Sequence, residues 1–313
     1  MSQIVTLTMN PALDRSLSIE HVAPSIKLRC DRDRLDPGGG GVNVSRAIHT
    51  MGGDTLPIYT CGGHMGAIYR RLVEREGIGG IAIEIEGETR EHIKVHETST
   101  GSIYRFQEPG PELDREDTDN AITTVCSLDP PPDYLVLSGS LPDGVGDDFY
   151  ARIIHKKQED TRVVVDTTAE GMLPALDEGG IFLIKPNVRE LGELMDRTLE
   201  GEAEIAEAAR GLIDRGAVEI VVTSLGPGGS IVITEDLRKR VEAPAVKVRS
   251  KVGAGDSMVG GIVLGLDQGK SVLEAVRFGT AVAAAAIMDQ MTGLGSREDA
   301  ERVYRQMIEL LEE

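Results

Sequence analysis

The sequence has few aromatic residues and few cysteines. Tryptophan is absent and aromatic residues make up only 3% of the 313 residues, so a packed core must be built mainly from aliphatic side chains. The three cysteines, Cys30, Cys61 and Cys126, form an odd set without C-x-x-C spacing. This pattern argues against a disulfide framework and favours reduced, buried thiols in a cytosolic protein.

Long apolar runs are also missing. None reaches the roughly 18 residues that a membrane span requires, and the N-terminal stretch MSQIVTLTMNP lacks the basic and apolar regions of a signal peptide. The run Ala281–Met288 (AVAAAAIM) is short and rich in alanine, and it predicts a closely packed buried helix. We therefore expect a cytoplasmic protein with no membrane partner.

Positive charge is scarce as well. The 33 lysine and arginine residues face 52 acidic residues, which gives a formal net charge of −19. Such a charge opposes nonspecific binding to nucleic acid or to anionic membranes, and an anionic ligand would need a local cluster of basic side chains. Apolar residues make up 40% of the chain, enough for a sizeable core in one large α/β domain or two smaller ones.

Short apolar segments predict the strands of a sheet that is buried on both faces. They are Gln3–Met9, Leu56–Thr60, Tyr134–Leu137, Val163–Asp166, Phe182–Ile184 and Ile220–Thr223, and helical patterns lie between them, among them Val42–Met51 and Glu202–Arg215. Polar or glycine-rich residues follow these strands, at the position where open α/β sheets bind ligands. The predicted fold class is α/β, with a mostly parallel central sheet flanked by helices.

A second group of segments alternates between polar and apolar residues and predicts exposed strands. These are Ser16–Glu20, Ile26–Leu35, Arg90–His96 and Ile103–Phe106, and we expect them to form a small sheet beside the main domain. Lys27 and Arg29 would point to one face of a strand, where a pair of cations can hold a phosphate. A solvated edge strand protected by its charges is the alternative interpretation. Arg90 and Arg105 are further candidate phosphate ligands.

Two glycine-rich turns lead directly into helical segments. Gly38–Gly41 precedes a helix with Asn43 one residue inside, which favours a backbone-lined ligand pocket. Gly253–Asp256 places a carboxylate at a helix start, where free N–H groups favour an anion. One interpretation is a phosphate handled beside a general base, and the other is a tight turn with Asp256 as a helix cap. Asp14, after the first strand, is either a hydroxyl ligand or an Asx-turn residue.

Three motifs in this order resemble the PfkB (ribokinase-like) carbohydrate kinases. They are GGGGVNVSRAIHTMGG at Gly38–Gly53, KPNVRE at Lys185–Glu190 and GAGD at Gly253–Asp256. The resemblance covers nearly the whole chain and implies a ribokinase-like fold. Within the family, the segments TLTMNPALD, IKLRC, PGGGGVNVSRA, TREHIKVH, SGSLPDGV and VGAGDSMVG are similar to the minor-type bacterial ATP-dependent 6-phosphofructokinases. Fructose-1-phosphate and tagatose-6-phosphate kinases usually carry GGKG, with a lysine where this chain has Gly40.

The resemblance implies a role for each matching residue. The substrate-binding set is Asp14, Lys27, Arg29, Gly39, Gly40, Asn43, Arg90 and Ser140, of which Lys27, Arg29, Arg90 and Ser140 would hold a 6-phosphate, with Arg105 a weaker candidate. The catalytic set is an anion hole at Gly253, Ala254 and Gly255 and a base at Asp256. The nucleotide would contact Lys185, Asn187, Ser224, Gly226 and Gly229, while Asn187 and Glu190 would position Mg²⁺.

The implied reaction is transfer of the γ-phosphoryl group of ATP to O1 of D-fructose 6-phosphate, with Mg²⁺ as cofactor. The expected organisation is one domain over residues 1–313, with lid strands inserted at about residues 15–37 and 88–108 and a homodimer through the lid sheet. Lys251 replaces a threonine common in the family near its monovalent-cation region, which puts K⁺ activation in question.

Three other functions compete with this interpretation. The first is the same chemistry on fructose 1-phosphate or tagatose 6-phosphate. The second is a noncatalytic sensor of sugar phosphates or nucleotides, which the intact Asp256, Asn187 and Glu190 disfavour. The third is a dinucleotide-dependent oxidoreductase, and the missing G-x-G-x-x-G fingerprint disfavours it.

Overall fold

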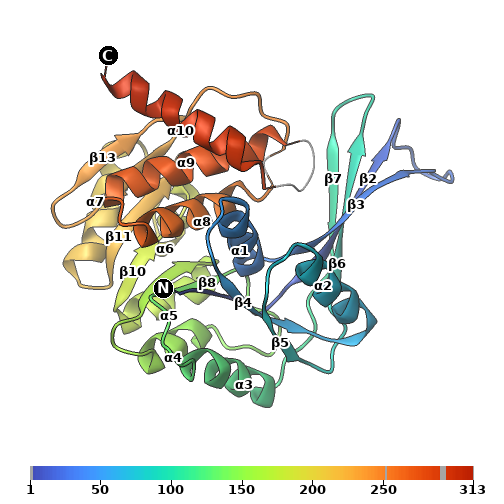
Figure 1. Cartoon of the computed structure of the whole chain (residues 1–313), viewed down its shortest axis with the longest axis horizontal. Coiled ribbons are helices and arrows are strands. Elements are labelled where there is room, and N and C mark those ends of the chain that lie inside the picture. Colours follow the sequence, from blue (N-terminus) through green and yellow to red (C-terminus); the bar gives the residue numbers. More distant parts are fainter. Residues whose placement is uncertain (1–2, 251, 290–293, 313) are drawn as a thin grey trace.

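The computed structural model describes residues 3–250, 252–289 and 294–312. Within these ranges a large sheet is built from β1 Ile4–Thr8, β4 Leu56–Cys61, β5 Ile81–Glu84, β8 Tyr134–Ser138, β9 Arg162–Asp166, β10 Ile181–Ile184, β11 Val218–Ser224, β12 Ser230–Ile233 and β13 Arg238–Val241. The strand order is β13-β12-β11-β10-β9-β8-β1-β4-β5 (Figure 1). Neighbouring strands are parallel from β11 to β5, whereas β12 and β13 extend the sheet as antiparallel strands.

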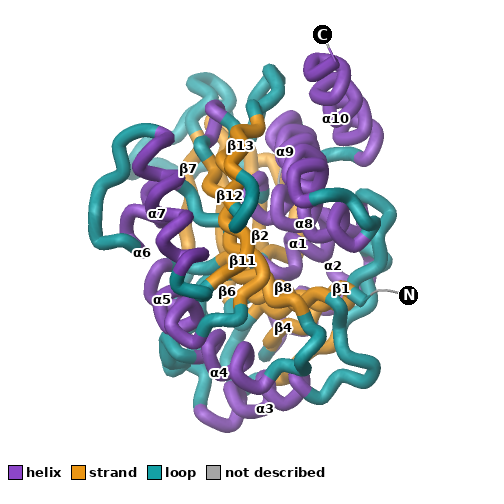
Figure 2. The backbone as a smooth tube through the Cα atoms, turned by 90° about the vertical axis from the view of Figure 1, so that its left-hand side faces the viewer, coloured by secondary structure: helices purple, strands orange, loops and turns teal. Residues whose placement is uncertain are grey.

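Helices cover both faces of this sheet (Figure 2). Their bounds are α1 Gly40–Thr50, α2 Gly63–Arg75, α3 Arg115–Cys126, α4 Phe149–Lys156, α5 Ala169–Glu178, α6 Val188–Leu194, α7 Glu202–Asp214, α8 Ala254–Asp267, α9 Val272–Met288 and α10 Arg297–Glu312, with a short 3-10 turn η1 at Gly226–Gly228. One apolar core joins the sheet to α3–α7, and a second joins it to α1 and α8–α10. The sheet is therefore the middle layer of three.

The predicted buried strands are confirmed. All six appear within two residues of their expected bounds, as β1, β4 and β8–β11. β1 is buried at each of its five residues, because it lies between β4 and β8 and is covered on both faces. The carboxyl ends of the parallel strands consequently meet at one edge of the sheet, where their polar loops come together. The short strands β5, β12 and β13 were not predicted.

Glycine and alanine allow α8 and α9 to pack closely. A Cβ on Gly261 of α8 would lie 2.7 Å from Cα of Gly279 on α9, so only glycine fits this approach. The run Ala281–Met288 forms the second half of α9, as predicted, and most of it is buried. This packing fixes the start of α8 at the carboxyl edge of the sheet. Among the described residues, no helix has the length and apolar character that crossing a membrane requires.

A second sheet of four strands stands beside the main body (Figure 1). Its strands are β2 Ala12–Ile19, β3 Asp31–Gly38, β6 Arg90–Glu97 and β7 Ile103–Gln107, in the order β3-β2-β6-β7. We call this sheet the lid. β2 pairs with β3 in antiparallel and with β6 in parallel fashion, so residues from both ends of the N-terminal third lie on adjacent strands.

The predicted strand Ile26–Leu35 is wrong in its first half. β3 begins only at Asp31, and residues 27–30 have no regular secondary structure; they follow a turn at Pro24 and Ser25, where Ser25 has a φ of 63°. Lys27 and Arg29 therefore lie in an irregular connection between β2 and β3 and are exposed. Their spacing of two residues does not place them on one face of a strand, as the sequence suggested.

Candidate active site

The carboxylate of Asp256 lies in the first turn of α8. The helix begins after Gly253, whose φ of 74° is a left-handed conformation suited to glycine, and no side chain caps it. The interpretation of Asp256 as a helix cap is therefore wrong. Its Oδ2 instead accepts a hydrogen bond of 2.9 Å from Nδ2 of Asn43 on α1. The first backbone N–H groups of a helix have no partner within it, so Ala254 and Gly255 offer donors to an anion.

The pKa of the Asp256 carboxyl is raised to about 7. Burial is the largest cause of this increase, and the negative charge of Asp166 is the next largest. The hydrogen bond from Asn43 and the charge of Lys185 act in the opposite direction. An ordinary aspartate has a pKa of about 3.9 and is a weak base. Asp256 is a stronger base than its residue type suggests, because the site makes its charged form costly.

Lys185 brings a buried cation to the same place. The residue follows β10, is only 6% exposed, and its Nζ lies 3.3 Å from Oδ1 of Asp166 at the end of β9. A Cβ on Gly255 would lie 3.5 Å from this Nζ, so the ammonium sits above the start of α8. Burial alone lowers the pKa of Lys185, but Asp166, Asp256 and Glu190 together raise it above its usual value. The lysine therefore remains charged.

Asp166 is a member of this cluster that the sequence did not identify. Its position after an apolar strand was visible in the sequence, because it is the last residue of β9. Its closeness to Lys185 and Asp256 depends on the strand order β10-β9-β8-β1, which the sequence leaves open. A charged residue at the end of a buried strand was thus the sequence signal for Asp166. The order of the strands in the sheet determines which of these charged residues lie close together.

Asn187 and Glu190 form a capping box at the start of α6. Oδ1 of Asn187 accepts from the N–H of Glu190 at 3.0 Å, and Oε2 of Glu190 accepts from the N–H of Asn187 at 2.9 Å. The box occupies one of the two carboxylate oxygens. In the described ranges there is no group of three or more metal-ligating side chains. Mg²⁺ is usually bound by one or two carboxylates together with waters and phosphate oxygens, and Glu190 is the carboxylate to which the sequence assigns this role.

The predicted nucleotide residues lie on the loop after β11. Ser224 pairs with Asn187, and its N–H donates to the carbonyl of Pro186 at 2.9 Å, so this loop adjoins the capping box. A Cβ on Gly226 would meet nothing within 4 Å, which leaves room for a ligand. At Gly229 a Cβ would lie 2.0 Å from the carbonyl oxygen of Val241. Packing against β13 alone therefore explains this second glycine.

The glycine segment at the start of α1 lies against three other elements. Gly39, the N-cap residue, has a φ of 116°, and a Cβ there would lie 2.7 Å from Thr8. At Gly40 it would lie 2.4 Å from Oγ of Ser138, and at Gly38 it would lie 2.3 Å from Oδ2 of Asp14. The glycines thus allow α1 to approach the ends of β1 and β8, and they allow the carboxylate of Asp14 on β2 to pack against the backbone at Gly38.

Asp14 connects the lid to this segment. It lies on β2, beside His92 of β6 in the register, and its Oδ1 is 3.4 Å from Nδ1 of His92. Asp14 also contributes to the raised pKa of Asp256. The structure therefore brings Asp14, Asn43 and Asp256 near one another at this edge of the sheet.

Arg90 and Ser140 meet through Asn10. A guanidinium nitrogen of Arg90, at the start of β6, donates to the carbonyl of Asn10 at 2.8 Å. Nδ2 of Asn10 lies 3.5 Å from Oγ of Ser140, in the loop after β8. Oδ1 of Asn10 and Nε of Arg90 are buried without a partner in the described part of the chain. Asn10 was not predicted, although it lies in the polar Asn-Pro end of the first strand.

The remaining predicted residues are not brought to this site. Lys27, Arg29 and Arg105 are exposed on the lid, and Arg105 affects the pKa of its neighbour Lys94, which burial lowers and Arg105 lowers further. Lys251 lies outside the described residues.

Comparisons with known proteins agree with this geometry. The family model described as pfkB family carbohydrate kinase matches residues 4–299. The chain is 38% identical over 303 residues to ATP-dependent 6-phosphofructokinase isozyme 2 of Mycobacterium tuberculosis, which covers 96% of this chain and 89% of the relative. Against the protein of the same name from Escherichia coli it is 37% identical over 305 residues, covering 97% and 98%.

A solved structure extends the similarity to three dimensions. The crystal structure of phosphofructokinase-2 from Escherichia coli in complex with fructose-6-phosphate has a TM-score of 0.92 and 36% identity, covering 98% of this chain and all of that one. Its fold agrees with the predicted ribokinase-like arrangement of one large, mostly parallel sheet and a small one. The chain belongs to the pfkB family of carbohydrate kinases.

Proposed function

We propose that this protein is an ATP-dependent 6-phosphofructokinase, which converts ATP and D-fructose 6-phosphate to ADP and fructose 1,6-bisphosphate. The observation that carries the proposal is the place of Asp256 in the first turn of α8, where its carboxylate accepts a hydrogen bond from Asn43 and lies near the buried ammonium of Lys185. Two relatives that are 37% and 38% identical to this chain are named ATP-dependent 6-phosphofructokinase isozyme 2, and a similar solved structure contains fructose-6-phosphate.

The sugar phosphate lies between the lid and the carboxyl edge of the sheet in this proposal. Arg90 and Ser140 bind its 6-phosphate, and the arrangement around Asn10 supports this role because both residues converge there. Asp14, Asn43 and the backbone at Gly39 and Gly40 bind its hydroxyls. The O1 hydroxyl then faces Asp256.

The chemical step is a single displacement at phosphorus. The O1 oxygen of the sugar forms a bond to the γ-phosphorus of ATP while the bond from that phosphorus to the β,γ-bridging oxygen breaks. The bridging oxygen keeps the bonding electrons and leaves as part of ADP. Asp256 accepts the proton of the O1 hydroxyl and later releases it to solvent. Transfer of this kind depends mainly on positioning and on neutralising charge.

The anion hole stabilises the transferred group. The N–H groups at Gly253, Ala254 and Gly255 face developing charge on the phosphoryl oxygens, and Lys185 adds a fixed cation above them. Such preorganised donors act most strongly where water is excluded. Ser224, Gly226 and Gly229 line the nucleotide behind this group.

Glu190 and Asn187, at the start of α6, would hold Mg²⁺ together with water and phosphate oxygens of ATP. When bound, it would neutralise phosphate charge. K⁺ is a proposed activator, although Lys251 replaces a threonine that is common near the cation region of the family. Comparing kcat in potassium and tetramethylammonium buffers tests this role, and equal kcat values would exclude activation by K⁺.

We also propose a homodimer through the lid. Its apolar side chains Ile26, Ile103 and Phe106 are exposed, and a second lid would cover them. The connection that carries Lys27 and Arg29 lies at the end of the lid away from α8 (Figure 1). Their proposed contact with a 6-phosphate therefore belongs to the site of the second chain.

The chain is proposed to be one domain with this lid inserted. Cys30, Cys61 and Cys126 are free thiols, which suits the proposed cytoplasmic location. Cys61 is buried and Cys126 partly so, whereas Cys30 is exposed, so the prediction of buried thiols is wrong for Cys30.

A coupled assay of ADP release tests the activity. Equal concentrations of fructose 6-phosphate, fructose 1-phosphate and tagatose 6-phosphate are compared at saturating ATP and Mg²⁺, and kcat/KM should be highest for fructose 6-phosphate. A higher kcat/KM for fructose 1-phosphate or tagatose 6-phosphate would instead identify the protein as a 1-phosphofructokinase or a tagatose-6-phosphate kinase. Binding of the sugars without turnover would identify a sensor instead.

A further inference from the structure

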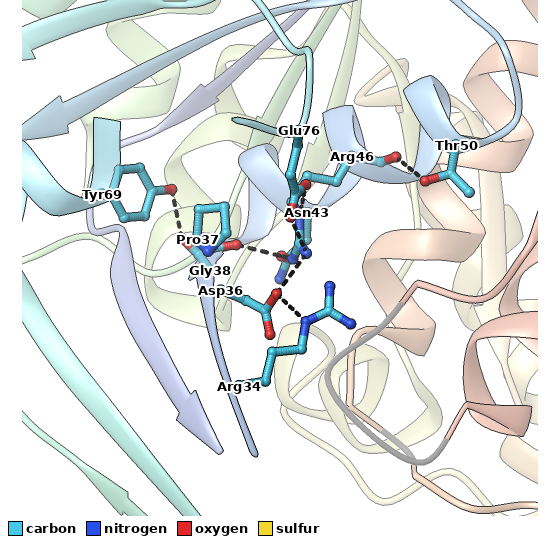
Figure 3. A network of polar contacts seen from close by, with 9 residues as sticks. All are labelled: Arg34, Asp36, Pro37, Gly38, Asn43, Arg46, Thr50, Tyr69 and Glu76. Carbon is cyan, nitrogen blue, oxygen red and sulfur yellow. Dashed lines mark hydrogen bonds and ion pairs between the residues drawn. The ribbon is translucent and has the colours of Figure 1, made fainter. Parts of the chain in front are cut away.

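Arg46 lies behind the site and is almost completely buried. It is on α1, three residues after Asn43 and therefore on the same side of the helix, and it is 4% exposed. Figure 3 shows its guanidinium at the centre of a polar network. It donates to Oδ1 of Asn43 at 3.3 Å, to the carbonyl of Pro37 at 3.0 Å and, at 3.4 Å, to Oδ1 of Asp36.

The far side of this guanidinium is anchored to α2. Glu76, the C-cap residue of α2, accepts two hydrogen bonds from Arg46, at 2.6 and 2.7 Å. Such a two-bond pair fixes the plane of an arginine as well as its place. Asp36 of β3 also accepts from Arg34, at 2.5 Å. Two arginines thus face two carboxylates, and the network joins α1, α2 and a lid strand.

The contacts of Arg46 decide which way the amide of Asn43 points. An asparagine amide has one accepting end and one donating end, whereas a guanidinium only donates. Oδ1 of Asn43 must therefore face Arg46, and Nδ2 is left to donate to Asp256 at 2.9 Å. With the amide reversed, Nδ2 would face a donor and Oδ1 would face a carboxylate, so both contacts would be repulsive.

The same arginine helps to hold the glycine segment. The carbonyl of Pro37 accepts from Arg46, and the carbonyl of Gly38, one residue later, accepts from the buried hydroxyl of Tyr69 at 2.7 Å (Figure 3). These two anchors precede Gly39, the N-cap of α1. The backbone that leads into the helix is thus fixed at two successive carbonyls.

We propose that Arg46 is a positioning residue of the catalytic centre, which orients the Asn43 amide toward Asp256 and ties that orientation to Asp36 of the lid. This inference rests on the proposed kinase activity. The hydrogen bond from Asn43 lowers the pKa of Asp256 and so favours the ionised form that accepts a proton. The other charged groups that act on Asp256 are Asp166, Lys185 and Asp14, and Arg46 contacts none of these in the described residues.

The test variant is Arg46→Lys. It keeps a positive charge beside Glu76 and Asp36, but an ammonium lacks the planar fork that reaches Glu76, Pro37 and Asn43 together. We expect kcat to fall about tenfold while KM for fructose 6-phosphate and for ATP stays within about twofold. The matched control is Arg34→Lys, because Arg34 shares Asp36 with Arg46 and, within the part of the chain that the structure describes, does not contact Asn43. Its kcat should stay within about twofold of wild type.

A double-mutant cycle separates orientation from general stability. In an Asn43→Ala background the amide is gone, so adding Arg46→Lys should leave kcat unchanged. An additional tenfold loss in that background would overturn the proposal, since Arg46 would then act without Asn43. If Arg46→Lys does not fold, Glu76→Gln removes one anchor of the guanidinium from a partly exposed helix end, and kcat should fall several-fold with unchanged KM. Wild-type kcat in that variant would also overturn the proposal.

A readout without turnover keeps the inference distinct from the proposed activity. The side-chain amide signal of Asn43 is identified by its loss in Asn43→Ala, and its protons should exchange with solvent at least tenfold faster in Arg46→Lys than in wild type. Unchanged exchange would overturn the positioning role. Absence of turnover in the wild-type protein with all three sugars would instead remove the kinase proposal and leave the amide measurement valid.

Discussion

Asp256 combines the place of a general base with a pKa that suits the task. General bases work best when their pKa lies near the working pH, and burial raises that of Asp256 to about 7. Because only the ionised form accepts the O1 proton, kcat/KM for fructose 6-phosphate should rise about tenfold per pH unit below pH 7 and level off above it. Initial rates between pH 5 and pH 9 measure this profile.

Substrate phosphates titrate at about pH 6 as well, so this profile needs a control. The residual activity of Asp256→Asn supplies it, because the variant keeps the substrate groups and should lack the inflection near pH 7. An inflection near pH 4, where an ordinary aspartate titrates, would contradict the raised pKa.

Replacement of Asp256 by asparagine should lower activity and raise stability. The folded pKa of about 7 exceeds the ordinary value of 3.8, so the folded state loses stability as pH rises between these values and the loss is complete above pH 7. Asp256→Asn removes this cost. We expect kcat to fall by roughly 10²–10⁴ with little change in KM, while the melting temperature relative to wild type is higher at pH 8 than at pH 5.

Calorimetry at the two pH values checks the stability half of this prediction. A variant that is less stable relative to wild type at pH 8 than at pH 5 would mean that the Asp256 charge is stabilising. Near wild-type kcat would remove Asp256 as the base.

Arg90 should affect the sugar phosphate and not the nucleotide. Its half-buried side chain donates to the carbonyl of Asn10, and burial lowers its pKa while Asp14 acts against this shift. A charge-assisted hydrogen bond contributes about 1.5–3 kcal/mol, so Arg90→Ala should raise KM for fructose 6-phosphate about ten- to a hundredfold with KM for ATP nearly unchanged. Arg115→Ala, on the exposed side of α3, is the control. Equal effects on both substrates would argue against a phosphosugar site at Arg90.

At the scale of elements, the start of α1 depends on contact with the end of β8. A Cβ at Gly40 would lie 2.4 Å from Oγ of Ser138 and 2.7 Å from the backbone nitrogen of Gly139. Gly40→Ala must therefore displace either α1 or the loop that carries Ser140. We expect a lower melting temperature and a KM for fructose 6-phosphate raised several-fold.

Gly211→Ala is a suitable control for that change. Gly211 lies in α7, where a Cβ meets nothing within 4 Å, and alanine is the better helix former. Its melting temperature should be equal to or above that of wild type. A Gly40→Ala variant with unchanged stability and KM would show that the loop adapts at no cost.

Elements with a strong local pattern were predictable from the sequence. The buried strands are short apolar runs, and α7 has one apolar stripe, so local composition was sufficient for both. The connection at Lys27 and Arg29 was not predictable in this way, because it alternates like the strand that follows it, although β3 begins only at Asp31. Alternation describes a strand only where a neighbouring strand pairs with it.

The site could be predicted only in the parts that short motifs carry. Asn43, Asn187 and Asp256 each belong to a local motif, whereas Asn10 and Asp166 take part through strand order. Arg46 was hidden for another reason. Its role follows from a hydrogen bond to Asn43 on one side and to Glu76 on the other, and these partners lie on separate helices.

At the scale of the whole molecule, the lid has an exposed face that a second chain can cover. All five residues of β7 are exposed, and Phe106 on this strand is 59% exposed. β7 is also an edge strand of its sheet, and exposed edges of this kind readily pair with another chain. The body of the protein, by contrast, has both faces of its sheet covered by helices (Figure 2). The lid is therefore the surface on which we expect the dimer to form.

Phe106→Glu should separate the dimer and weaken sugar-phosphate binding together. The introduced carboxylate would be buried against a second lid, which is costly without a partner charge, so light scattering should give the mass of one chain where wild type gives twice that mass. Because Lys27 and Arg29 then no longer reach a second site, KM for fructose 6-phosphate should rise about tenfold while KM for ATP stays the same. Leu173→Glu, at an exposed leucine of α5, is the control and should stay dimeric. If Phe106→Glu is a monomer with an unchanged KM for fructose 6-phosphate, Lys27 and Arg29 do not bind the sugar phosphate. If it remains a dimer, the interface lies on another surface.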